Sequence, residues 1–335
     1  MENAKKALVE AGSIHAEKYS PELVKQAEEY YDLAISNWRT QNEEWFFQRD
    51  FSRTKNFADL SEKAAREAIK EAIAHEANLS ETLSSELTEL RKKVKKSQFL
   101  FTSFPFNNDL KKNFTRGGMM LSEAELDYQK SDLLNCKTKL ARAKNLIDES
   151  VKSAISILKN DFRNYNNWIA LKDKTISWSK ANGAYACLVD KYNRKCYVYK
   201  NGKLYSTYSV ELGPNWVGPK RQSGDDRTPE GMYKVTKKKS GVHTRYYKAL
   251  LINYPNEQDV EDLKNSQKKG ILSKHAKSGG LIEIHGDGGK GFDWTNGCVA
   301  LTNSDMDKIY SISYVGMPVN IVGSLTSLNE ILSGL

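Results

Sequence analysis

The sequence predicts a multidomain α+β protein, in which long helices form a bundle or stalk and precede a mostly β domain. Over about the first 160 residues, apolar side chains recur every three or four positions, a spacing typical of amphipathic helices. From about residue 183 onwards, apolar and polar residues alternate in short runs that end at glycine, proline or asparagine, which indicates strands. With 335 residues, the chain is long enough for two or three hydrophobic cores.

The first part of the chain is predicted to contain three successive helices. The first covers residues 3–19, after which Ser20 supplies an N-cap and Pro21 a first helical residue. The second helix then continues to about residue 55. The third covers about 57–96 and contains neither proline nor glycine, so it is expected to be long.

Residues 97–120 interrupt this periodicity with Pro105 and the pair Gly117-Gly118. They are predicted to form a loop or short hairpin with exposed aromatic residues. Ser122 opens a capping-box pattern, and we expect it to start a last long helix that continues to Leu158.

The second part of the chain is predicted to be a sheet with short connections. Strands are expected at 185–190, 195–200, 203–213, 232–239, 249–255, 281–286 and 318–323, with helical segments at 257–270 and 305–313. The predicted domains are therefore a helical domain at 1–160, a linker at 161–182, a sheet domain at 183–323 and a tail at 324–335.

Composition limits the classes of function. The formal net charge of +9 suits a polyanionic partner such as a cell-wall polymer or nucleic acid, although a solvated basic surface is the simpler interpretation. No apolar run is long enough to span a membrane. The four cysteines show no CxxC spacing, so a zinc or thioredoxin-like site is not expected, and Cys136, Cys187 and Cys196 are expected to be buried.

One stretch, residues 284–301, combines a histidine and a cysteine at the ends of predicted strands. His285 and Cys298 are thirteen positions apart, with glycines on both sides of the interval. A thiol is a strong nucleophile only as the thiolate, and an imidazole is the commonest group that removes its proton. The stretch is therefore predicted to be a Cys/His active site. No acidic or histidine companion stands at ligand spacing, so neither a metal nor a cofactor is expected.

Four motifs surround this pair in a fixed order. They are GDDRTPEGMY at 224–233, LINYPN at 251–256, IEIHG at 282–286 and TNGCVALTN at 295–303. In this order and spacing, residues 183–323 resemble an L,D-transpeptidase catalytic domain of the YkuD-like type. The resemblance implies a β-sandwich-like fold, a cysteine nucleophile and peptidoglycan stem peptides as substrate.

The resemblance also implies roles for the residues of the pair. Cys298 would attack an amide carbonyl of the stem peptide and carry the acyl group as a thioester. His285 would be the base for the thiol and the acid for the leaving amine. The backbone carbonyl of Gly286 would orient the imidazole ring.

The turn before the cysteine is expected to bind the oxyanion. The N–H groups of Asn296, Gly297 and Cys298 are the candidate donors, and the Thr295 hydroxyl would brace the turn or the histidine. Asn296 stands where the family usually has histidine, so a second acid or base at that position is not expected.

Ala300 stands where many members carry an arginine that would bind a substrate carboxylate. That contact must therefore come from elsewhere or be absent, and Arg227 and Lys290 are the candidates. The other predicted substrate-binding residues are Asp226, Tyr233, Phe292 and Trp294.

Three functions remain open on the sequence alone. The first is a transpeptidase that cross-links stem peptides, exchanges D-amino acids or attaches proteins. The second is a cysteine amidase or carboxypeptidase of the same fold, which hydrolyses wall peptides or releases wall-linked protein. The third is a non-enzymatic scaffold that binds the cell wall.

The expected partners are peptidoglycan stem peptides and, through the helices, envelope proteins, but neither nucleic acid nor a membrane span. The N-terminus shows no signal-peptide pattern. A periplasmic or other extracytoplasmic location is therefore expected on the assumption that a signal has been removed.

Overall fold

The computed structural model describes residues 1–335 and divides into two compact units. The first unit contains residues 1–94 and 115–147, and the second contains 95–114 and 148–335. The division does not fall at one point of the sequence, because helices α3 (Ser52–Ser103), α4 (Asn108–Gln129) and α5 (Leu133–Asp161) each contribute to both units.

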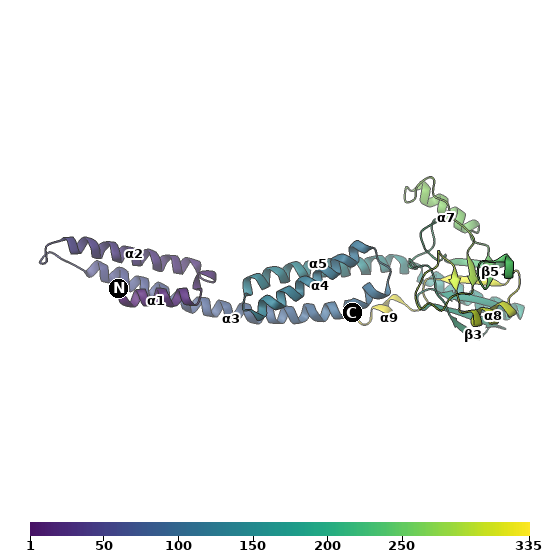
Figure 1. Cartoon of the computed structure of the whole chain (residues 1–335), viewed down its shortest axis with the longest axis horizontal. Helices are drawn as coiled ribbons and strands as arrows, with labels where there is room; N and C mark the ends of the chain where they lie inside the picture. The colour runs from purple at the N-terminus through teal and green to yellow at the C-terminus, as the bar shows by residue number, and fades with distance from the viewer. The chain divides into compact units, whose positions relative to one another are not determined.

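The first unit is helical and has a core of small side chains. It contains α1 (Glu2–Ser13), the short 3-10 helix η1 (Ala16–Lys18), α2 (Pro21–Glu43) and the first part of α3 (Figure 1). As predicted, α2 begins at Pro21 with Ser20 as its N-cap. Helices α1, α2 and α3 meet along a seam of buried alanines, which permits close approach: Ala4, Ala7, Ala11, Ala27, Ala34, Ala58, Ala64, Ala65 and Ala72.

The loop between α2 and α3 presents three consecutive aromatic residues to solvent. Trp45, Phe46 and Phe47 are 72%, 79% and 69% exposed. The Arg49 side chain holds the loop by donating hydrogen bonds to the carbonyl oxygens of Asn42 and Glu44, both at 3.0 Å. The prediction that the second helix continues to about residue 55 was therefore wrong, because this loop interrupts it.

The loop or hairpin predicted at 97–120 was also wrong, because most of these residues are helical. Helix α3 continues to Ser103, and α4 begins at Asn108. Gly117 lies inside α4, where a Cβ atom would stand 2.7 Å from Ile147 Cγ1 of α5. This glycine therefore permits close helix packing and does not break the helix.

Four of the five aromatic residues of this segment are buried and Phe99 is partly buried, contrary to the prediction. The cluster consists of Phe101, Phe104, Phe106 and Phe114. Phe104 is 1% exposed, and its ring centroid lies 5.9 Å from that of Tyr192 and 5.3 Å from that of Trp216. The end of α3 and the start of α4 therefore belong to the core of the second unit.

Ser122 does not start a helix. It lies within α4, and its hydroxyl donates a hydrogen bond to the carbonyl oxygen of Gly118 one turn earlier. The last long helix of this region, α5, begins at Leu133 instead.

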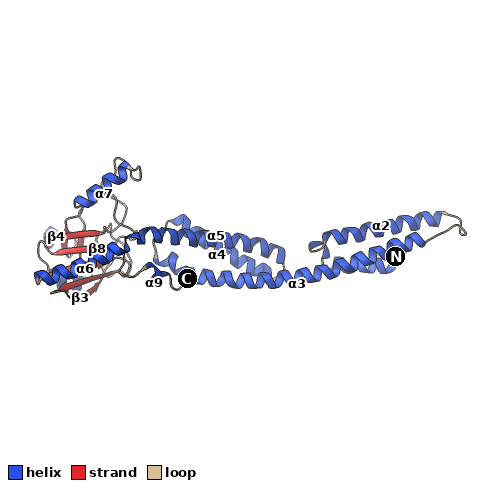
Figure 2. Cartoon of the chain, turned by 180° about the vertical axis from the view of Figure 1, so that it is seen from behind, coloured by secondary structure: helices blue, strands red, loops and turns tan.

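The segment predicted as a linker at 161–182 is largely helix α6 (Tyr165–Asn182), preceded by the 3-10 turn η2 (Phe162–Asn164). Helix α6 packs along strands of the sheet (Figure 2). Trp168 is 2% exposed, and Thr175 Oγ1 accepts a 2.8 Å hydrogen bond from Asn320 of β8. The segment is therefore part of the sheet unit.

The second unit contains one mixed sheet of eight strands in the order β3-β2-β1-β8-β4-β5-β6-β7. The strands are β1 (Tyr185–Asp190), β2 (Lys195–Lys200), β3 (Lys203–Ser209), β4 (Gly231–Ser240), β5 (Lys248–Ile252), β6 (Glu283–His285), β7 (Val299–Ala300) and β8 (Pro318–Val322). The pairs β1/β8 and β6/β7 are parallel, and the other pairs are antiparallel.

The sheet curls so that its two edges approach each other. Glu211, two residues after the edge strand β3, forms an antiparallel bridge with Ala300 of the opposite edge strand β7. The predicted fold class, long helices followed by a mostly β domain, is confirmed.

Short helices complete the unit. They are α7 (Glu257–Lys268), α8 (Asn303–Ile312), α9 (Leu328–Leu332) and the 3-10 turn η3 (Gly241–His243). Among all the helices, none combines the length and the apolar character needed to cross a bilayer.

Candidate active site

The sheet brings His285 and Cys298 to neighbouring strands. His285 is the last residue of β6, and Cys298 directly precedes β7. The parallel register pairs Ile284 with Val299 and His285 with Ala300, so Cys298 stands beside Glu283. The Glu283 amide donates a hydrogen bond to Cys298 Sγ, and Sγ lies 3.7 Å from the carbonyl oxygen of Leu281, to which the thiol donates.

The His285 ring is held in one orientation. Its Nδ1 lies 2.6 Å from the carbonyl oxygen of Gly286. A carbonyl oxygen only accepts, so this contact assigns the ring proton to Nδ1 and leaves a lone pair on Nε2. Nε2 is buried and has no hydrogen-bond partner. The acceptor nitrogen and the Cys298 thiol are therefore not hydrogen-bonded to each other in this structure.

Two aromatic rings enclose the imidazole. The Tyr246 ring lies parallel to it, with centroids 3.5 Å apart and an interplanar angle of 9°. The edge of Trp294 approaches at 5.8 Å. Burial lowers the pKa of His285, because the charged imidazolium loses its hydration. The ring is therefore neutral at physiological pH and can accept a proton.

Burial also sets the protonation state of the Cys298 thiol. Cys298 is 8% exposed, and burial raises its pKa to about 11, although the Glu283 amide and the charge of Arg245 act in the opposite direction. The resting pair is therefore a neutral thiol beside a neutral imidazole. Any attack by this sulfur would therefore require transfer of its proton, because the pair holds no stable thiolate.

The turn from Thr295 to Cys298 is fixed by its own hydrogen bonds. Thr295 Oγ1 donates to the carbonyl oxygen of Cys298 at 2.7 Å and accepts from the Gly297 amide at 3.2 Å. The Asn296 side chain is exposed. The amides of Asn296 and Cys298 donate to no protein acceptor, so they are the available oxyanion donors, whereas the Gly297 amide is occupied.

Gly297 adopts a conformation that only glycine tolerates. Its φ is +119°, and a Cβ atom here would collide with the carbonyl oxygen of Arg227. The turn thus packs directly against the loop that carries the GDDR motif.

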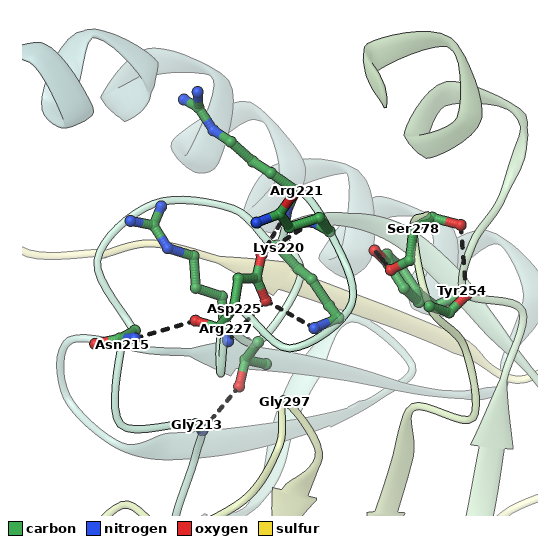
Figure 3. Close-up of polar contacts among 12 residues, drawn as sticks. Gly213, Asn215, Lys220, Arg221, Asp225, Arg227, Tyr254, Ser278 and Gly297 are labelled. Atoms are coloured by element: carbon green, nitrogen blue, oxygen red, sulfur yellow. Dashed lines mark hydrogen bonds and ion pairs between the residues drawn. The ribbon is translucent and has the colours of Figure 1, made fainter. Parts of the chain in front are cut away.

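Asp225 organises that loop (Figure 3). Its carboxylate accepts hydrogen bonds from Lys220 Nζ at 2.7 Å and from the amides of Arg221, Gln222 and Arg227 at 2.7, 3.0 and 3.1 Å. Burial alone would raise the pKa of Asp225, but these donors outweigh it and lower the pKa. Sequence analysis missed Asp225, although its place in GDDR was the available signal.

Two residues of this loop that were predicted to bind substrate, Arg227 and Asp226, contact other parts of the protein. The Arg227 guanidinium lies beside Gly218, where an added Cβ would stand 2.8 Å from Nη1 and 3.2 Å from Asp161 Oδ1. The charge of Arg227 also acts on the Asp161 carboxyl group. The carbonyl oxygen of Asp226 accepts from the Asn215 amide at 3.2 Å. The Arg227 guanidinium therefore lies near the end of α5, and Asp226 contributes its main chain to the hydrogen bonding of the loop.

Tyr233 is also away from the pair. It is 4% exposed, and its hydroxyl lies 3.0 Å from Asp259 Oδ1 and 3.1 Å from the carbonyl oxygen of Glu230. It therefore braces the start of α7 in the interior.

The structure brings Lys290 and Trp294 together near the histidine. Lys290 Nζ lies 3.3 Å from the centroid of the Trp294 ring, and Trp294 Nε1 donates to Glu211 Oε2 at 2.7 Å. Phe292 is 61% exposed and lines a neighbouring cavity of about 680 Å³ with Arg194 and Asp293, which form a 2.8 Å ion pair.

Three further residues near the site were missed by sequence analysis. Arg245 and Tyr246 lie on the connection between β4 and β5, where no sequence pattern pointed to the site. Glu283 is 7% exposed and forms a 2.6 Å ion pair with Lys239. Since alternate residues of a strand face the same side, the position of Glu283 two before His285 could have revealed it.

No group of three or more histidine, cysteine, aspartate or glutamate side chains is arranged to hold a metal ion. All four cysteines are buried and free, as expected for Cys136, Cys187 and Cys196.

Comparison with known families agrees with this arrangement. The family model of the L,D-transpeptidase catalytic domain (YkuD) matches residues 184–321, which include both His285 and Cys298. Residues 184–321 are an L,D-transpeptidase catalytic domain. The helices that precede this L,D-transpeptidase domain lie outside the match.

Individual relatives resemble only part of the chain. YafK of Escherichia coli K12, whose name assigns it to the L,D-transpeptidases, is 32% identical over 108 residues, which are 32% of this chain and 37% of YafK. The chain therefore spans little more than a third of this relative.

Solved L,D-transpeptidases show a more distant likeness. The enzyme of Mycobacterium smegmatis is 12% identical, with 42% of this chain and 58% of that chain covered and a TM-score of 0.28. The enzyme of Xylanimonas cellulosilytica is 13% identical, with 42% of this chain and 61% of that chain covered and a TM-score of 0.29.

Proposed function

We propose that this protein is an L,D-transpeptidase that acts on peptidoglycan stem peptides through a thioester on Cys298. The observation that carries the proposal is that an unpartnered imidazole nitrogen lies at the end of β6 and a buried thiol lies directly before the neighbouring strand β7. The YkuD match supports it, because both residues fall within residues 184–321.

In the first half-reaction, a stem-peptide amide is cleaved. His285 Nε2 takes the thiol proton as Cys298 Sγ attacks the carbonyl carbon, so that a C–S bond forms. The amides of Asn296 and Cys298 donate hydrogen bonds to the developing oxyanion. The C–N bond then breaks, and His285 returns the proton to the departing amine, which leaves as the terminal D-amino acid.

In the second half-reaction, an amine resolves the thioester. The amine attacks the acyl carbon, a new C–N bond forms, and the C–S bond breaks. The proton lost by the amine passes through His285 to the sulfur, which restores the thiol. An acceptor from a second stem gives a cross-link, a free D-amino acid gives exchange, and a protein amine gives attachment.

Product analysis tests this proposal. The full-length protein is incubated with disaccharide-tetrapeptide, and the products are followed by mass spectrometry. We expect cross-linked dimer or D-amino-acid exchange from the wild type, and neither from Cys298→Ala. Tripeptide as the sole product would instead establish hydrolysis, in which water replaces the amine.

Acylation by a carbapenem tests whether an acyl-enzyme forms on Cys298, independently of which acceptor would resolve it. We expect one adduct on the peptide that contains Cys298, and none on the buried Cys136, Cys187 or Cys196. If the wild type gained no mass, the non-enzymatic alternative, a wall-binding scaffold, would be favoured.

We also propose that the protein works outside the cytoplasm and that its helical unit positions the catalytic domain through an envelope protein. Ala65 offers a test, because it is 0% exposed in the alanine seam and lies in the first unit. A buried unpaired charge at Ala65→Asp should disrupt these helices. We expect wall modification in cells to fall several-fold more than the rate on soluble muropeptide. Equal losses in both assays would contradict a positioning role.

A further inference from the structure

We propose that Arg245 binds the α-carboxylate of the residue that leaves the acyl-donor peptide. This inference rests on the function proposed above. It assigns the anion-binding role to a cation that lies one aromatic ring away from His285.

Arg245 is fixed beside the catalytic histidine through an aromatic stack. Its Nη2 donates to the Tyr246 hydroxyl at 2.7 Å, and its guanidinium carbon lies 4.9 Å from the centroid of that ring. The same Tyr246 ring is parallel to His285 at 3.5 Å. The guanidinium is therefore held one ring away from the base, while its side chain remains exposed to solvent.

Arg245 is also a cation of this region that no carboxylate neutralises. Lys220 pairs with Asp225 at 2.7 Å, and Lys239 pairs with Glu283 at 2.6 Å. Arg245 forms no ion pair, and its charge reaches far enough to favour the thiolate of Cys298, lowering the pKa of that thiol against the effect of burial. An incoming carboxylate would therefore meet a guanidinium whose donors are largely available.

Strand β7, which lies beside His285, carries no cation. Ala300 is 0% exposed and pairs with His285 in the parallel register of β6 and β7. Its main chain also bridges to Glu211. The connection between β4 and β5 instead brings the Tyr246 ring against the imidazole and leaves the Arg245 side chain exposed.

Lys290 is the rival cation. Its ammonium group lies over the Trp294 ring at 3.3 Å, an arrangement that already satisfies part of its charge. A guanidinium can also donate two parallel hydrogen bonds to one carboxylate, whereas an ammonium group acts as a point charge. Both differences favour Arg245.

A binding experiment tests the assignment without requiring turnover. The Cys298→Ala protein is titrated calorimetrically with a tetrapeptide that ends in a free carboxylate and with the same peptide as its C-terminal carboxamide. We expect the carboxylate form to bind about tenfold more tightly, the size of effect that one charge-assisted contact gives. Arg245→Gln in this background should abolish the preference, and Arg245→Lys should restore part of it.

Two further variants make the result specific. Lys203→Gln removes an equal charge from the exposed edge strand β3 and should leave the preference unchanged. Lys290→Gln tests whether Lys290, and not Arg245, binds the carboxylate. The assignment is overturned if Arg245→Gln weakens both peptides equally, or if the preference disappears in Lys290→Gln and survives in Arg245→Gln.

Acylation and calorimetry on these proteins can show separately whether the proposed function or the Arg245 assignment fails. If a carbapenem fails to acylate the wild type while the calorimetric preference depends on Arg245, the transpeptidase proposal fails and the binding site stands. If acylation succeeds and the preference does not depend on Arg245, the reverse holds.

Discussion

At the scale of single residues, the site depends on how burial sets protonation. Cys298 and His285 are both neutral at rest, because desolvation raises the pKa of the thiol and lowers the pKa of the imidazole. The active site thus differs from a preformed thiolate–imidazolium pair. In the proposed mechanism, substrate binding must therefore help to make the sulfur nucleophilic.

This protonation state predicts the pH dependence of alkylation at Cys298. Because its pKa is raised to about 11, the thiolate fraction should grow roughly tenfold for each pH unit between pH 7 and 9. The rate of iodoacetamide modification, followed on the peptide containing Cys298, should rise accordingly without a plateau. A plateau reached below pH 8 would show that the thiolate already forms near neutral pH.

Gly297→Ala should disturb the turn from Thr295 to Cys298. The positive φ costs an alanine about 1 kcal/mol or more, and the added Cβ also collides with the backbone of the Asp225 loop. We expect carbapenem acylation to slow by at least tenfold. Gly291→Ala is the matched control, because its φ is +82° but no atom lies within 4 Å of the added Cβ. Equal acylation rates in the two variants would contradict the role of the turn.

The raised pKa of Asp161, at the end of α5, predicts that the stability of the protein depends on pH. Burial, with the nearby Glu230 charge, raises its pKa to about 6, whereas the unfolded value is about 3.9. Between these values the folded state binds more protons, so this group's contribution to stability falls as the pH rises from about 4 through 6.

Asp161→Asn should therefore raise the thermal midpoint at pH 7.5 by a few degrees and have little effect at pH 4. Thermal unfolding followed by circular dichroism at the two pH values measures this. A midpoint that falls at pH 7.5 would mean that attraction to Arg227, Arg221 and Lys191 outweighs burial.

At the scale of elements, the end of α3 contributes to the core of the sheet unit. Phe104→Ala should cost about 3–5 kcal/mol, because a nearly fully buried ring is removed from contact with Tyr192 and Trp216. The unfolding midpoint of the sheet unit in urea should fall. Trp45→Ala is the control, since its ring is 72% exposed and its removal should change stability by less than about 0.5 kcal/mol. Similar shifts in both variants would refute the assignment.

The sequence predicted elements well where one local signal decided them. The Ser20-Pro21 start of α2 and the strands β1 and β2 were predicted correctly. It failed at α6, because the buried face of this helix includes the polar Thr175 and Ser179 and hides the apolar periodicity. At Gly117 it failed because close packing against Ile147, a contact distant in sequence, requires the glycine.

At the scale of the whole molecule, the candidate site could be predicted only in part. His285, Cys298 and the turn between them lie in one short stretch, so their motif is visible in the sequence. Tyr246 reaches the imidazole through the pairing of β5 with β6, a long-range contact that no local pattern encodes. Tyr233 was expected in the cleft for its motif, but the fold uses its hydroxyl to hold Asp259.

The bridge between Glu211 and Ala300 limits how a peptide can reach the sulfur. The Ala300 amide donates to the carbonyl oxygen of Glu211 at 2.8 Å, and the Glu211 amide returns a bond to Ala300 at 2.9 Å. The outer edge of β7 is thus already paired beside the nucleophile. Under the proposed function, a stem peptide could not extend the sheet there by β-strand addition. It would be recognised by its side chains and termini, which would permit a short, branched peptide without a regular backbone to serve as substrate.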